Sequence, residues 1–509
     1  MTLVRVTTAA EASWLDARAI SAGTPARTLM QRAGEAAAAA ILRAYPDVVG
    51  ATVNVYVGPG NNGGDGWVVA RALSGLGARV FVREAGDARS DETKAERDLA
   101  QRAVTRGESA SAALVVDALL GVGARGEPRG EIAACIASIA EARARGAAVV
   151  SLDVPSGVDA DTGASAHAVR ADLTLTFGTL KRGLAIARGN TGRIVVLDIG
   201  LGERASDDAL PRLVDSHWVR TQVPPIRADA HKGTRRKLII IGGQVGMAGA
   251  PMLAARAAMR SGIGMVRLVV SRENVPVVQA AVPEAPAHAW PESAEEVEST
   301  IMGWADAVVI GPGLGASYGS RSLVERVLRD YRGPVLLDAD ALNVFAGESE
   351  QLGELIGDRA ALLTPHPAEC ARLFGIPIDD VLARRFEIGA ELARRARATV
   401  LLKGVPTVIA HPGGERLVSC AGTPVLAAAG SGDLLSGIAG TLLAQIGNAL
   451  TAGACAAWVH GRAAEIAGRR YVRGVTFANL DLALRRVWNE PLAVLEPPVL
   501  AELPAVGER

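Results

Sequence analysis

The chain has 509 residues, 49% of them hydrophobic, and its 54 Lys and Arg residues balance 54 Asp and Glu residues. This length exceeds the usual size of one hydrophobic core, so we expect two domains. The balanced charge gives no indication of a nucleic-acid-binding surface. Four isolated cysteines argue against a disulfide framework or a thiolate zinc site, and we expect them to be buried in a protein of the reducing cytoplasm.

The first twenty residues, MTLVRVTTAAEASWLDARAI, contain no basic segment followed by a long apolar core. We therefore expect neither a secretory signal nor a membrane anchor. The longest apolar stretches are interrupted by Gly and polar residues well before they reach the length of a membrane-spanning helix.

Residues 52–77, TVNVYVGPGNNGGDGWVVARALSGLG, predict an alternating strand, a loop rich in Asn and Gly, and a helix. Strand–glycine loop–helix units of this kind bind a pyrophosphate at the N-terminus of the helix. Gly58, Gly60 and Gly63 have the G-x-G-x-x-G spacing of dinucleotide-binding proteins, but the loop differs from theirs in being rich in amide side chains. The structural alternative is a turn with its asparagines in the left-handed conformation.

Two later segments, 114–130 and 148–163, each place an aspartate at the end of an apolar strand and follow it with a glycine-containing loop. In a parallel sheet, the carboxyl ends of the strands converge on one crevice. We therefore expect Asp117, Asp153 and the NNGGD segment to be neighbours.

These motifs, together with LMQRAG (29–34) and LDIGL (197–201), resemble the NAD(P)H-hydrate epimerases over nearly all of residues 10–205. The resemblance implies a potassium ion held by Asn62, Asp117 and Ser156, whose oxygen atoms suit a hard cation. It also implies that the hydrated dinucleotide is bound by Asn61, Asn62, Gly63, Gly64, Asp65, Gly121, Val122, Gly123, Ala124, Arg125, Gly126, Glu127 and Asp153.

Interconversion of the R and S hydrates requires the C–O bond at one ring carbon to open and re-form through a cationic intermediate. A nearby carboxylate can stabilise this charge and move the hydroxyl proton. Asp153 is the first candidate for this catalytic role, and Asp117 is the alternative if potassium binds elsewhere. Val122 stands where the family usually has Thr, a change that a backbone phosphate contact would survive.

Residues 205–230 are charged, contain prolines and lack periodicity, which indicates a boundary between a domain over 1–210 and a domain over 220–509. Short apolar runs alternating with helical segments then predict buried parallel strands, whose polar ends line the ligand-binding edge of a sheet. The runs are 237–243, 306–315, 333–343, 360–369 and 399–407.

Residues 421–440, AGTPVLAAAGSGDLLSGIAG, predict a glycine-rich turn and a helix that starts near Leu434. Gly430 and Gly432 allow a tight turn, and the positive end of the helix dipole points at the same place, so we expect an anion site. A carboxylate beside a phosphate is repulsive unless it handles a proton or a cation, which makes Asp433 a catalytic candidate. The structural alternative is an N-cap aspartate.

Seven segments in order, from HKGTRRKLIIIGG to AGSGDLLSGIAG (231–440), resemble the ribokinase-like ADP- or ATP-dependent NAD(P)H-hydrate dehydratases. The resemblance implies that Asp433 takes the proton of the substrate hydroxyl and that Mg²⁺ accompanies the nucleotide. It implies a nucleotide site of Lys403, Gly404, Val405, Pro406, Thr407 and Gly432, and a hydrated-dinucleotide site of Ala250, Gly315, His366 and Asp433. Taken without the resemblance, His366 is equally a loop residue that caps a strand end, and Arg236 stands where the family commonly has Gly.

The two halves together resemble the bifunctional NAD(P)H-hydrate repair enzymes. We therefore expect an α/β fold with two domains, each a mainly parallel sheet layered with helices, Rossmann-like in the N-terminal half and ribokinase-like in the C-terminal half. The alternative is a ribokinase-type vitamin or sugar kinase with a fused nucleotide-binding or scaffolding domain. The sequence does not distinguish ADP from ATP as donor, because such a site binds the phosphates that the two share. The composition, rich in Ala, Arg and Gly, suits a bacterial protein, and the resemblance implies that bacterial members of the family usually use ADP. The resemblance also implies a homo-oligomer.

Overall fold

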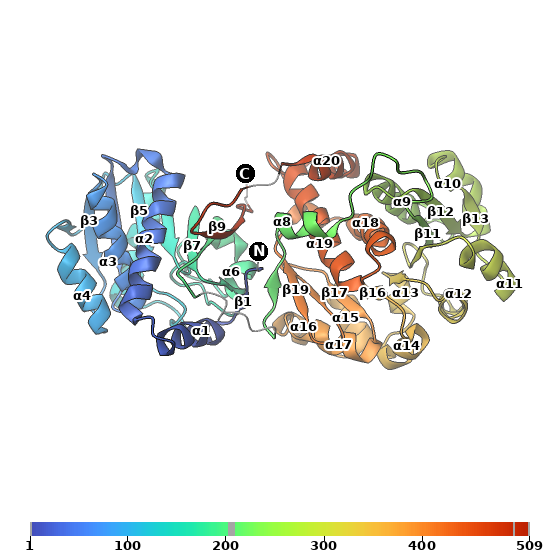
Figure 1. The fold of residues 1–509 in the computed structure, drawn as a ribbon, viewed down its shortest axis with the longest axis horizontal. Helices are drawn as coiled ribbons and strands as arrows, with labels where there is room; N and C mark the ends of the chain where they lie inside the picture. Colours follow the sequence, from blue (N-terminus) through green and yellow to red (C-terminus); the bar gives the residue numbers. More distant parts are fainter. Residues whose placement is uncertain (1–2, 202–208, 492–493, 507–509) are drawn as a thin grey trace. The chain divides into compact units, whose positions relative to one another are not determined.

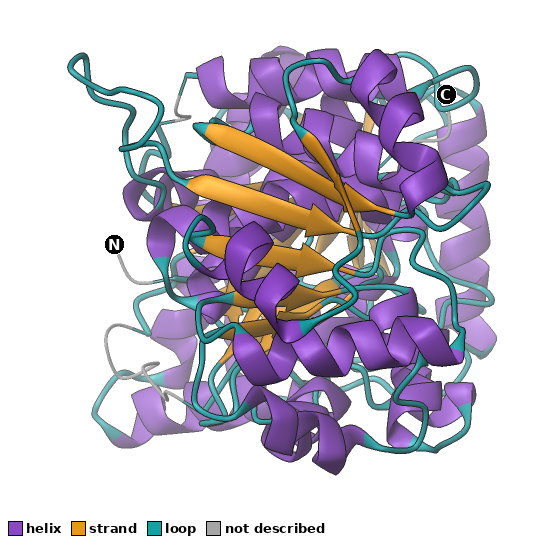
Figure 2. Ribbon diagram, turned by 90° about the vertical axis from the view of Figure 1, so that its right-hand side faces the viewer, coloured by secondary structure: helices purple, strands orange, loops and turns teal. Residues whose placement is uncertain are grey.

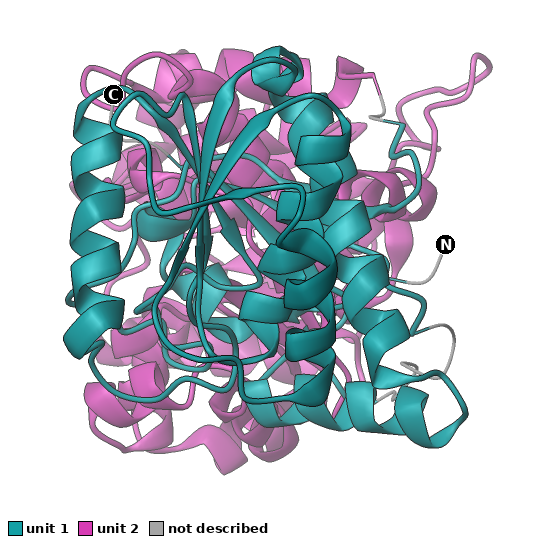
Figure 3. Cartoon of the chain, turned by 90° about the vertical axis from the view of Figure 1, so that its left-hand side faces the viewer, with its two compact units in different colours: residues 1–210, 494–507 teal, residues 211–493, 508–509 magenta. Residues whose placement is uncertain are grey.

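The computed structural model describes residues 3–201, 209–491 and 494–506. It divides into two compact units, one of residues 1–210 with 494–507 and one of residues 211–493 with 508–509 (Figures 1 and 3). Residues 205–208 of the predicted boundary segment lie outside the described residues. All four cysteines are buried, as predicted. In the described part of the chain, no helix combines the length and apolar character needed to span a membrane.

The first unit contains an eight-stranded sheet with helices on both faces (Figure 3). Neighbouring strands are parallel except for the antiparallel pair β20–β9. In spatial order the strands are β20 (Val499–Leu503), β9 (Arg193–Leu197), β7 (Leu173–Phe177), β6 (Ala148–Leu152), β5 (Leu114–Ala118), β2 (Thr52–Val57), β3 (Arg79–Glu84) and β4 (Thr105–Arg106). The central strands β2, β5 and β7 are buried at every residue, as expected for a parallel sheet covered on both sides.

The helices of this unit are α1 (Ala9–Ser21), α2 (Ala26–Ala44), α3 (Asn61–Gly75), α4 (Asp91–Ala100), α5 (Gly130–Ala144), α6 (Arg182–Ile186) and α7 (Arg188–Thr191). A separate parallel pair joins β1 (Val6–Thr7) to β8 (Leu180–Lys181). The NNGGDG segment, predicted as a loop, instead forms the first turns of α3. Neither asparagine has a positive φ, so the left-handed turn is wrong. The glycines serve close approach, since a Cβ at Gly63 would lie 1.9 Å from the carbonyl oxygen of Gly58.

The last strand of the chain belongs to the first unit, whereas the sequence assigned residues 220–509 to the second domain. β20 pairs with β9, with Leu503 opposite Ile194. Ala501 and Leu503 are buried in this unit, with exposed fractions of 2% and 8%. The first unit is therefore discontinuous in sequence.

The second unit contains a ten-stranded sheet, also covered by helices on both faces (Figure 2). In spatial order its strands are β10 (Arg212–Leu213), β19 (Arg416–Ser419), β18 (Thr407–Ala410), β17 (Thr399–Leu402), β16 (Ala361–Leu363), β15 (Val335–Leu337), β14 (Ala307–Ile310), β11 (Lys237–Ile241), β12 (Met265–Val270) and β13 (Ala287–Ala289). The pairs β17–β18 and β18–β19 are antiparallel and the others are parallel. The five apolar runs of the sequence form β11 and β14 to β17, which are neighbours in the sheet.

The helices of the second unit are α8 (Ser216–Gln222), α9 (Gly249–Arg260), α10 (Val275–Ala281), α11 (Ala294–Val297), α12 (Tyr318–Asp330), α13 (Asp340–Asn343), α14 (Ser349–Ile356), α15 (Pro367–Phe374), α16 (Ile378–Ala383), α17 (Ile388–Ala396), α18 (Ser431–Ile446), α19 (Ala449–Ala467) and α20 (Phe477–Asn489). α18 follows Gly430, whose φ of 93° lies in the left-handed region. The helix therefore starts three residues before the predicted Leu434.

Two candidate active sites

In the first unit, the NNGGD segment and the loops after β5 and β6 meet at the carboxyl edge of the sheet, as expected from the sequence. Asn62, in the first turn of α3, is buried, and its amide nitrogen Nδ2 donates to the carbonyl oxygens of Leu120 at 2.9 Å and Leu152 at 3.3 Å. These two bonds join the start of α3 to the ends of both strands. The amide oxygen Oδ1 of Asn62 is buried without a hydrogen-bond partner.

Asp117 is fully buried and forms the centre of a hydrogen-bond network. Its carboxylate accepts hydrogen bonds from the hydroxyls of Ser151 (2.8 Å) and Ser156 (2.5 Å). It also accepts the backbone N–H groups of Ser156 (2.8 Å) and Leu119 (3.3 Å). Burial raises the pKa of Asp117, although these hydrogen bonds act in the opposite direction. The Ser156 hydroxyl also accepts the Leu120 N–H at 2.9 Å, which fixes both loops to Asp117.

Asp153 follows β6 in a left-handed backbone conformation, with φ of 61°, which is strained for a residue with a side chain. One carboxylate oxygen accepts the Val122 N–H at 3.2 Å. The other lies 2.8 Å from Nζ of Lys181, a residue with an exposed fraction of 3%. Lys181 also donates to the Thr176 hydroxyl (3.1 Å) and to the carbonyl of Phe177 (2.9 Å). The strained backbone therefore presents the Asp153 carboxylate to a buried cation.

Two further carboxyl groups act on this ion pair. Burial raises the pKa of Asp65 well above its usual range, and the negative charges of Asp153 and Asp16 add to this pKa shift. Burial likewise raises the pKa of Asp16, against the effect of Lys181. The site thus combines one buried ion pair with two carboxyl groups whose pKa values are raised by burial.

The predicted loop of residues 121–127 borders the same place. A Cβ at Gly121 would lie 3.2 Å from both Asn62 Cβ and an Asp153 carboxylate oxygen, so this loop passes directly over both side chains. The exposed Arg125 forms an ion pair with Asp161 at 3.0 Å. The rest of the loop is half-buried or exposed, namely Val122, Gly123, Ala124, Gly126 and Glu127.

In the second unit, Asp433 lies in the first turn of α18. The N-cap position is occupied by Gly430, so the alternative in which Asp433 caps the helix is wrong. A Cβ at Gly430 would lie 2.9 Å from the ring of Phe477, so glycine is required here by both space and φ. The helix therefore presents its N-terminal N–H groups and a carboxylate together.

Lys403, at the end of β17, lies 2.9 Å from a carboxylate oxygen of Asp338, which follows β15. The other Asp338 oxygen accepts the Ser436 hydroxyl of α18 at 2.6 Å. Glu369 lies 3.7 Å from Lys403 Nζ. Burial would lower the pKa of Lys403, but the charges of Asp338 and Glu369 outweigh it and raise this pKa. A Cβ at Gly432 would lie 3.5 Å from Lys403 Nζ, so the ammonium group is beside the helix N-terminus.

Burial raises the pKa of Asp433 to about 7. The negative charges of Asp338 and Asp340 contribute to this pKa shift, and Lys403 opposes it. Asp340 also accepts the N–H of Gly315 at 2.8 Å, which joins the GPGLG loop after β14 to this group. A carboxyl group that titrates near neutral pH is suited to general base catalysis.

His366 is the N-cap of α15 and forms a capping box with Glu369. Its Nδ1 accepts the N–H groups of Ala368 (3.1 Å) and Glu369 (3.3 Å). Burial lowers the pKa of His366, and about half of its side chain is exposed. His366 therefore caps the start of a helix, and its other ring nitrogen, Nε2, lies 3.4 Å from a carboxylate oxygen of Glu369.

The other predicted residues lie on loops of the same edge. Ala250, at the start of α9, packs against the GPGLG loop, since a Cβ at Gly313 would lie 3.1 Å from Ala250 Cβ. In the 403–407 loop, Gly404 and Val405 are exposed, Pro406 is buried, and the Thr407 hydroxyl donates to the Gly404 carbonyl at 3.1 Å.

Sequence reasoning did not single out several charged or hydroxyl side chains of the two sites, namely Asp16, Lys181, Asp338, Glu369 and Ser436. A lysine inside an apolar segment is an available signal for Lys181, and an acidic residue directly after an apolar strand is one for Asp338. Neither signal identifies the partner of the charged group.

Two family models match the chain, NAD(P)H-hydrate dehydratase over residues 238–485 and YjeF-related protein N-terminus over residues 26–183. Among solved structures, a ribokinase-like superfamily protein from Enterococcus faecalis is 24% identical, with a TM-score of 0.50, covering 55% of this chain and 95% of that one. The ADP/ATP-dependent NAD(P)H-hydrate dehydratase from Bacillus subtilis, co-crystallized with ATP/Mg²⁺, is 30% identical with a TM-score of 0.48, covering 54% and 96%.

Curated relatives match nearly the whole chain. The bifunctional NAD(P)H-hydrate repair enzyme Nnr of Moorella thermoacetica is 36% identical over 495 residues, 91% of this chain and 92% of the relative. The enzyme of the same name from Escherichia coli is 36% identical over 481 residues, 91% of this chain and 89% of the relative. With both halves matched in a single relative, the chain belongs to the family of bifunctional NAD(P)H-hydrate repair enzymes.

Proposed function

We propose that this chain repairs hydrated NADH and NADPH. The first unit interconverts the R and S hydrates, and the second removes water from the S hydrate with ADP or ATP as phosphoryl donor. Family membership over nearly the whole chain supports both activities. The single observation that carries the dehydratase assignment is a carboxyl group with a pKa near 7 in the first turn of α18, beside Lys403.

In the dehydratase reaction, hydroxide is a poor leaving group, and phosphorylation of the ring hydroxyl makes it a better one. Asp433 would accept the hydroxyl proton as the oxygen attacks the terminal phosphorus of the donor. The N–H groups at the start of α18 and the Lys403 ammonium group would stabilise the transferring phosphoryl group. Loss of phosphate and of a proton from the adjacent ring carbon then restores the dihydronicotinamide.

The residues at this place suit a nucleotide with its magnesium ion. Gly432, at the helix N-terminus, faces Lys403, whose Nζ would lie 3.5 Å from a Cβ at this position, and the 403–407 loop is exposed at Gly404 and Val405. Among the described residues, no group of three or more His, Cys, Asp or Glu side chains could hold a metal ion alone. Mg²⁺ would therefore arrive with the phosphates, whose charge it neutralises. Asp433 and Asp338 are the nearby carboxylates.

In the epimerase reaction, we assign the catalytic role to Asp153. Its carboxylate is held by Lys181 and by the Val122 N–H, and it borders the loop of residues 121–127. There it would stabilise positive charge on the ring as the C–O bond opens and would take up or return the hydroxyl proton. Asp65, whose pKa burial raises well above its usual range, is close enough for the Asp153 charge to raise this pKa further.

Potassium fits the residues around Asn62. The buried and unpartnered Oδ1 of Asn62 is a free oxygen donor, and Asp117 and Ser156 supply carboxylate and hydroxyl oxygens. Such oxygens are the ligands of hard cations. Replacing potassium by tetramethylammonium should slow epimerisation and leave dehydration of the S hydrate unchanged.

The first experiment follows the recovery of absorbance at 340 nm from a mixture of R and S hydrates of NADH. The wild type and Asp433→Asn are each compared with ADP, with ATP and without nucleotide. Full recovery with one donor, lost in the variant, would establish both activities, because a dehydratase alone would restore only the S fraction quickly. A stable phosphate ester as product would instead indicate a ribokinase-type kinase of another substrate.

A further inference from the structure

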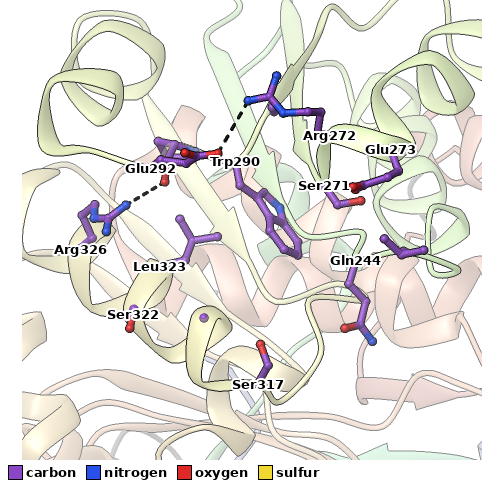
Figure 4. Close-up of a pocket in the computed structure, with 14 residues that line it drawn as sticks. Gln244, Ser271, Arg272, Glu273, Trp290, Glu292, Ser317, Ser322, Leu323 and Arg326 are labelled. Carbon is purple, nitrogen blue, oxygen red and sulfur yellow. Dashed lines mark hydrogen bonds and ion pairs between the residues drawn. The ribbon is translucent and has the colours of Figure 1, made fainter.

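The second unit contains a solvent-open cavity of about 530 Å³. None of the residues assigned above to the two sites lines it. It lies at the carboxyl ends of β11, β12 and β13 and beside the start of α12 (Figure 4). Its lining includes Gln244, Ser271, Arg272, Trp290, Ser317 and Arg326. Its volume falls in the range typical of sites for small molecules.

Gln244 connects the cavity to the proposed dehydratase site. Gln244, which lines the cavity, lies against Gly315, since a Cβ at Gly315 would be 2.1 Å from the Gln244 amide oxygen. The Gly315 N–H is bound to Asp340, one of the charges that act on Asp433. A ligand with its reactive ring near Gly315 and Asp433 can therefore extend into this cavity.

The order of the sheet separates this cavity from the place of the phosphoryl donor. The donor loop follows β17, and the strands between it and those that border the cavity are β16, β15 and β14. Asp338 and the GPGLG loop follow β15 and β14, midway along this edge. Because parallel strands present all these ends on one edge, two ligands that meet near Asp433 would leave it in opposite directions.

The lining offers contacts for a base and a sugar phosphate. The Trp290 indole N–H donates to the Gly242 carbonyl at 2.9 Å, which holds the ring beside the cavity (Figure 4). Ser271 has an exposed fraction of 6%, and its hydroxyl has no hydrogen-bond partner among the described residues. Buried hydroxyls are ordinarily paired, so this one is available for a hydrogen bond to a polar atom of a ligand. Arg326 lies at the wall, bound to the Pro291 carbonyl at 2.8 Å.

We propose that this cavity binds the adenosine half of the hydrated dinucleotide. The adenine ring stacks on Trp290, and a polar atom of the base or ribose pairs with the Ser271 hydroxyl. The pyrophosphate lies between the cavity and Gly315, near the N-terminus of α12. This inference rests on the proposed dehydratase function, and it explains how the same protein would distinguish a dinucleotide from its nicotinamide half.

The test compares two substrates of the full chain with ADP or ATP as donor. One is the S hydrate of NADH, and the other is the S hydrate of reduced nicotinamide mononucleotide, which lacks the adenosine half. Trp290→Ala should raise KM for the NADH hydrate at least about fivefold. It should leave KM for the truncated hydrate and for the donor unchanged. Ser271→Ala should raise KM for the NADH hydrate about threefold and should not lower stability, because it removes an unpaired hydroxyl.

Trp304→Ala is the matched control. Trp304 and Trp290 are both half-buried and pack against the same core, but Trp304 does not line the cavity. The control should therefore show any loss of stability without the substrate-specific change in KM. Unchanged KM for the NADH hydrate in Trp290→Ala and Ser271→Ala, or an equal rise for both hydrates, would overturn the inference. Wild-type protein that turns over neither hydrate would instead overturn the proposed function, and the inference with it.

Discussion

The Lys181 ammonium group lies 2.8 Å from the Asp153 carboxylate, and the two side chains have exposed fractions of only 3% and 11%. Removal of one partner from such a pair leaves the other as an uncompensated buried charge. Lys181 is placed for this contact by the short β8, which pairs with β1 near the start of the chain. The N-terminal strand therefore helps to position a group that faces the candidate catalytic carboxylate.

We predict that Lys181→Met lowers the free energy of unfolding of the first unit by about 3–5 kcal/mol. It should also slow recovery of NADH from the R hydrate, while dehydration of the S hydrate continues. Urea denaturation and the 340 nm assay measure the two effects. Lys94→Met is the control, because Lys94 pairs with the exposed Asp91 and should contribute less than about 1 kcal/mol. Equal stability of the two variants would contradict the importance of the buried pair.

The dehydratase rate should depend on the ionisation of Asp433. Because its pKa is raised to about 7 and a general base must be ionised, kcat/KM for the S hydrate should rise with pH and level off above about 8. Asp433→Asn should lose about 10²–10⁴ of the activity and this pH dependence together. Initial rates between pH 5.5 and 8.5 test both expectations. A flat wild-type profile would argue against Asp433 as the base.

Ionisation of Asp433 should also destabilise the folded protein. The pKa of Asp433 in the fold, about 7, exceeds the ordinary 3.8, so the native state holds this proton more tightly than the unfolded state does. Stability should therefore fall as pH rises from about 4 to about 7. At pH 8, Asp433→Asn should exceed the wild type by up to about 4 kcal/mol, and the difference should shrink toward pH 4. Denaturant titrations of both proteins at several pH values measure this trend, and a variant less stable than the wild type at pH 8 would contradict it.

Arg236, which stands where the family commonly has Gly, has a φ of 72° in the structure. This left-handed conformation is strained for arginine and unstrained for glycine. Arg236→Gly should therefore be more stable than Arg236→Ala by about 1 kcal/mol. Both variants lose the same half-exposed ion pair with Asp306. Their difference in stability therefore measures the cost of the left-handed backbone conformation at position 236. Thermal denaturation of the two variants makes the test; equal melting temperatures would rule out the strain.

Leu503, on β20, should contribute to the stability of the first unit although it is nearly the last described residue. Leu503→Asp places a charge at a buried position and should lower the free energy of unfolding by about 2–4 kcal/mol. The adjacent Glu502→Ala is the control, because that side chain is 41% exposed. On warming, Leu503→Asp should also lose turnover of the R hydrate while it retains turnover of the S hydrate. Equal stability of Leu503→Asp and Glu502→Ala would contradict the packing role of β20.

The sequence predicts the strands well where apolar residues are continuous. Runs such as KLIII and TVLL become β11 and β17 because both faces of a parallel sheet are buried and every position must be apolar. The aspartates that follow strands, such as Asp117 and Asp153, are predictable for the same reason, since strand ends meet at one edge.

Contacts made by distant segments could not be predicted in this way. The three glycines of NNGGDG disfavour a helix and predict a loop, but the close approach of Gly63 to Gly58 requires glycine within α3. Lys181 reaches Asp153 through a two-residue strand too short to produce a pattern. β20 follows a long helical region, and nothing in its own residues indicates β9 as its partner.

Because β20 is an edge strand of the first unit's sheet, that sheet is complete only after residues 499–503 have been synthesised. The residues of the second unit, 211–493, leave the ribosome in the meantime, while β9 still has an unpaired edge. The unit made first is thus the last to be finished.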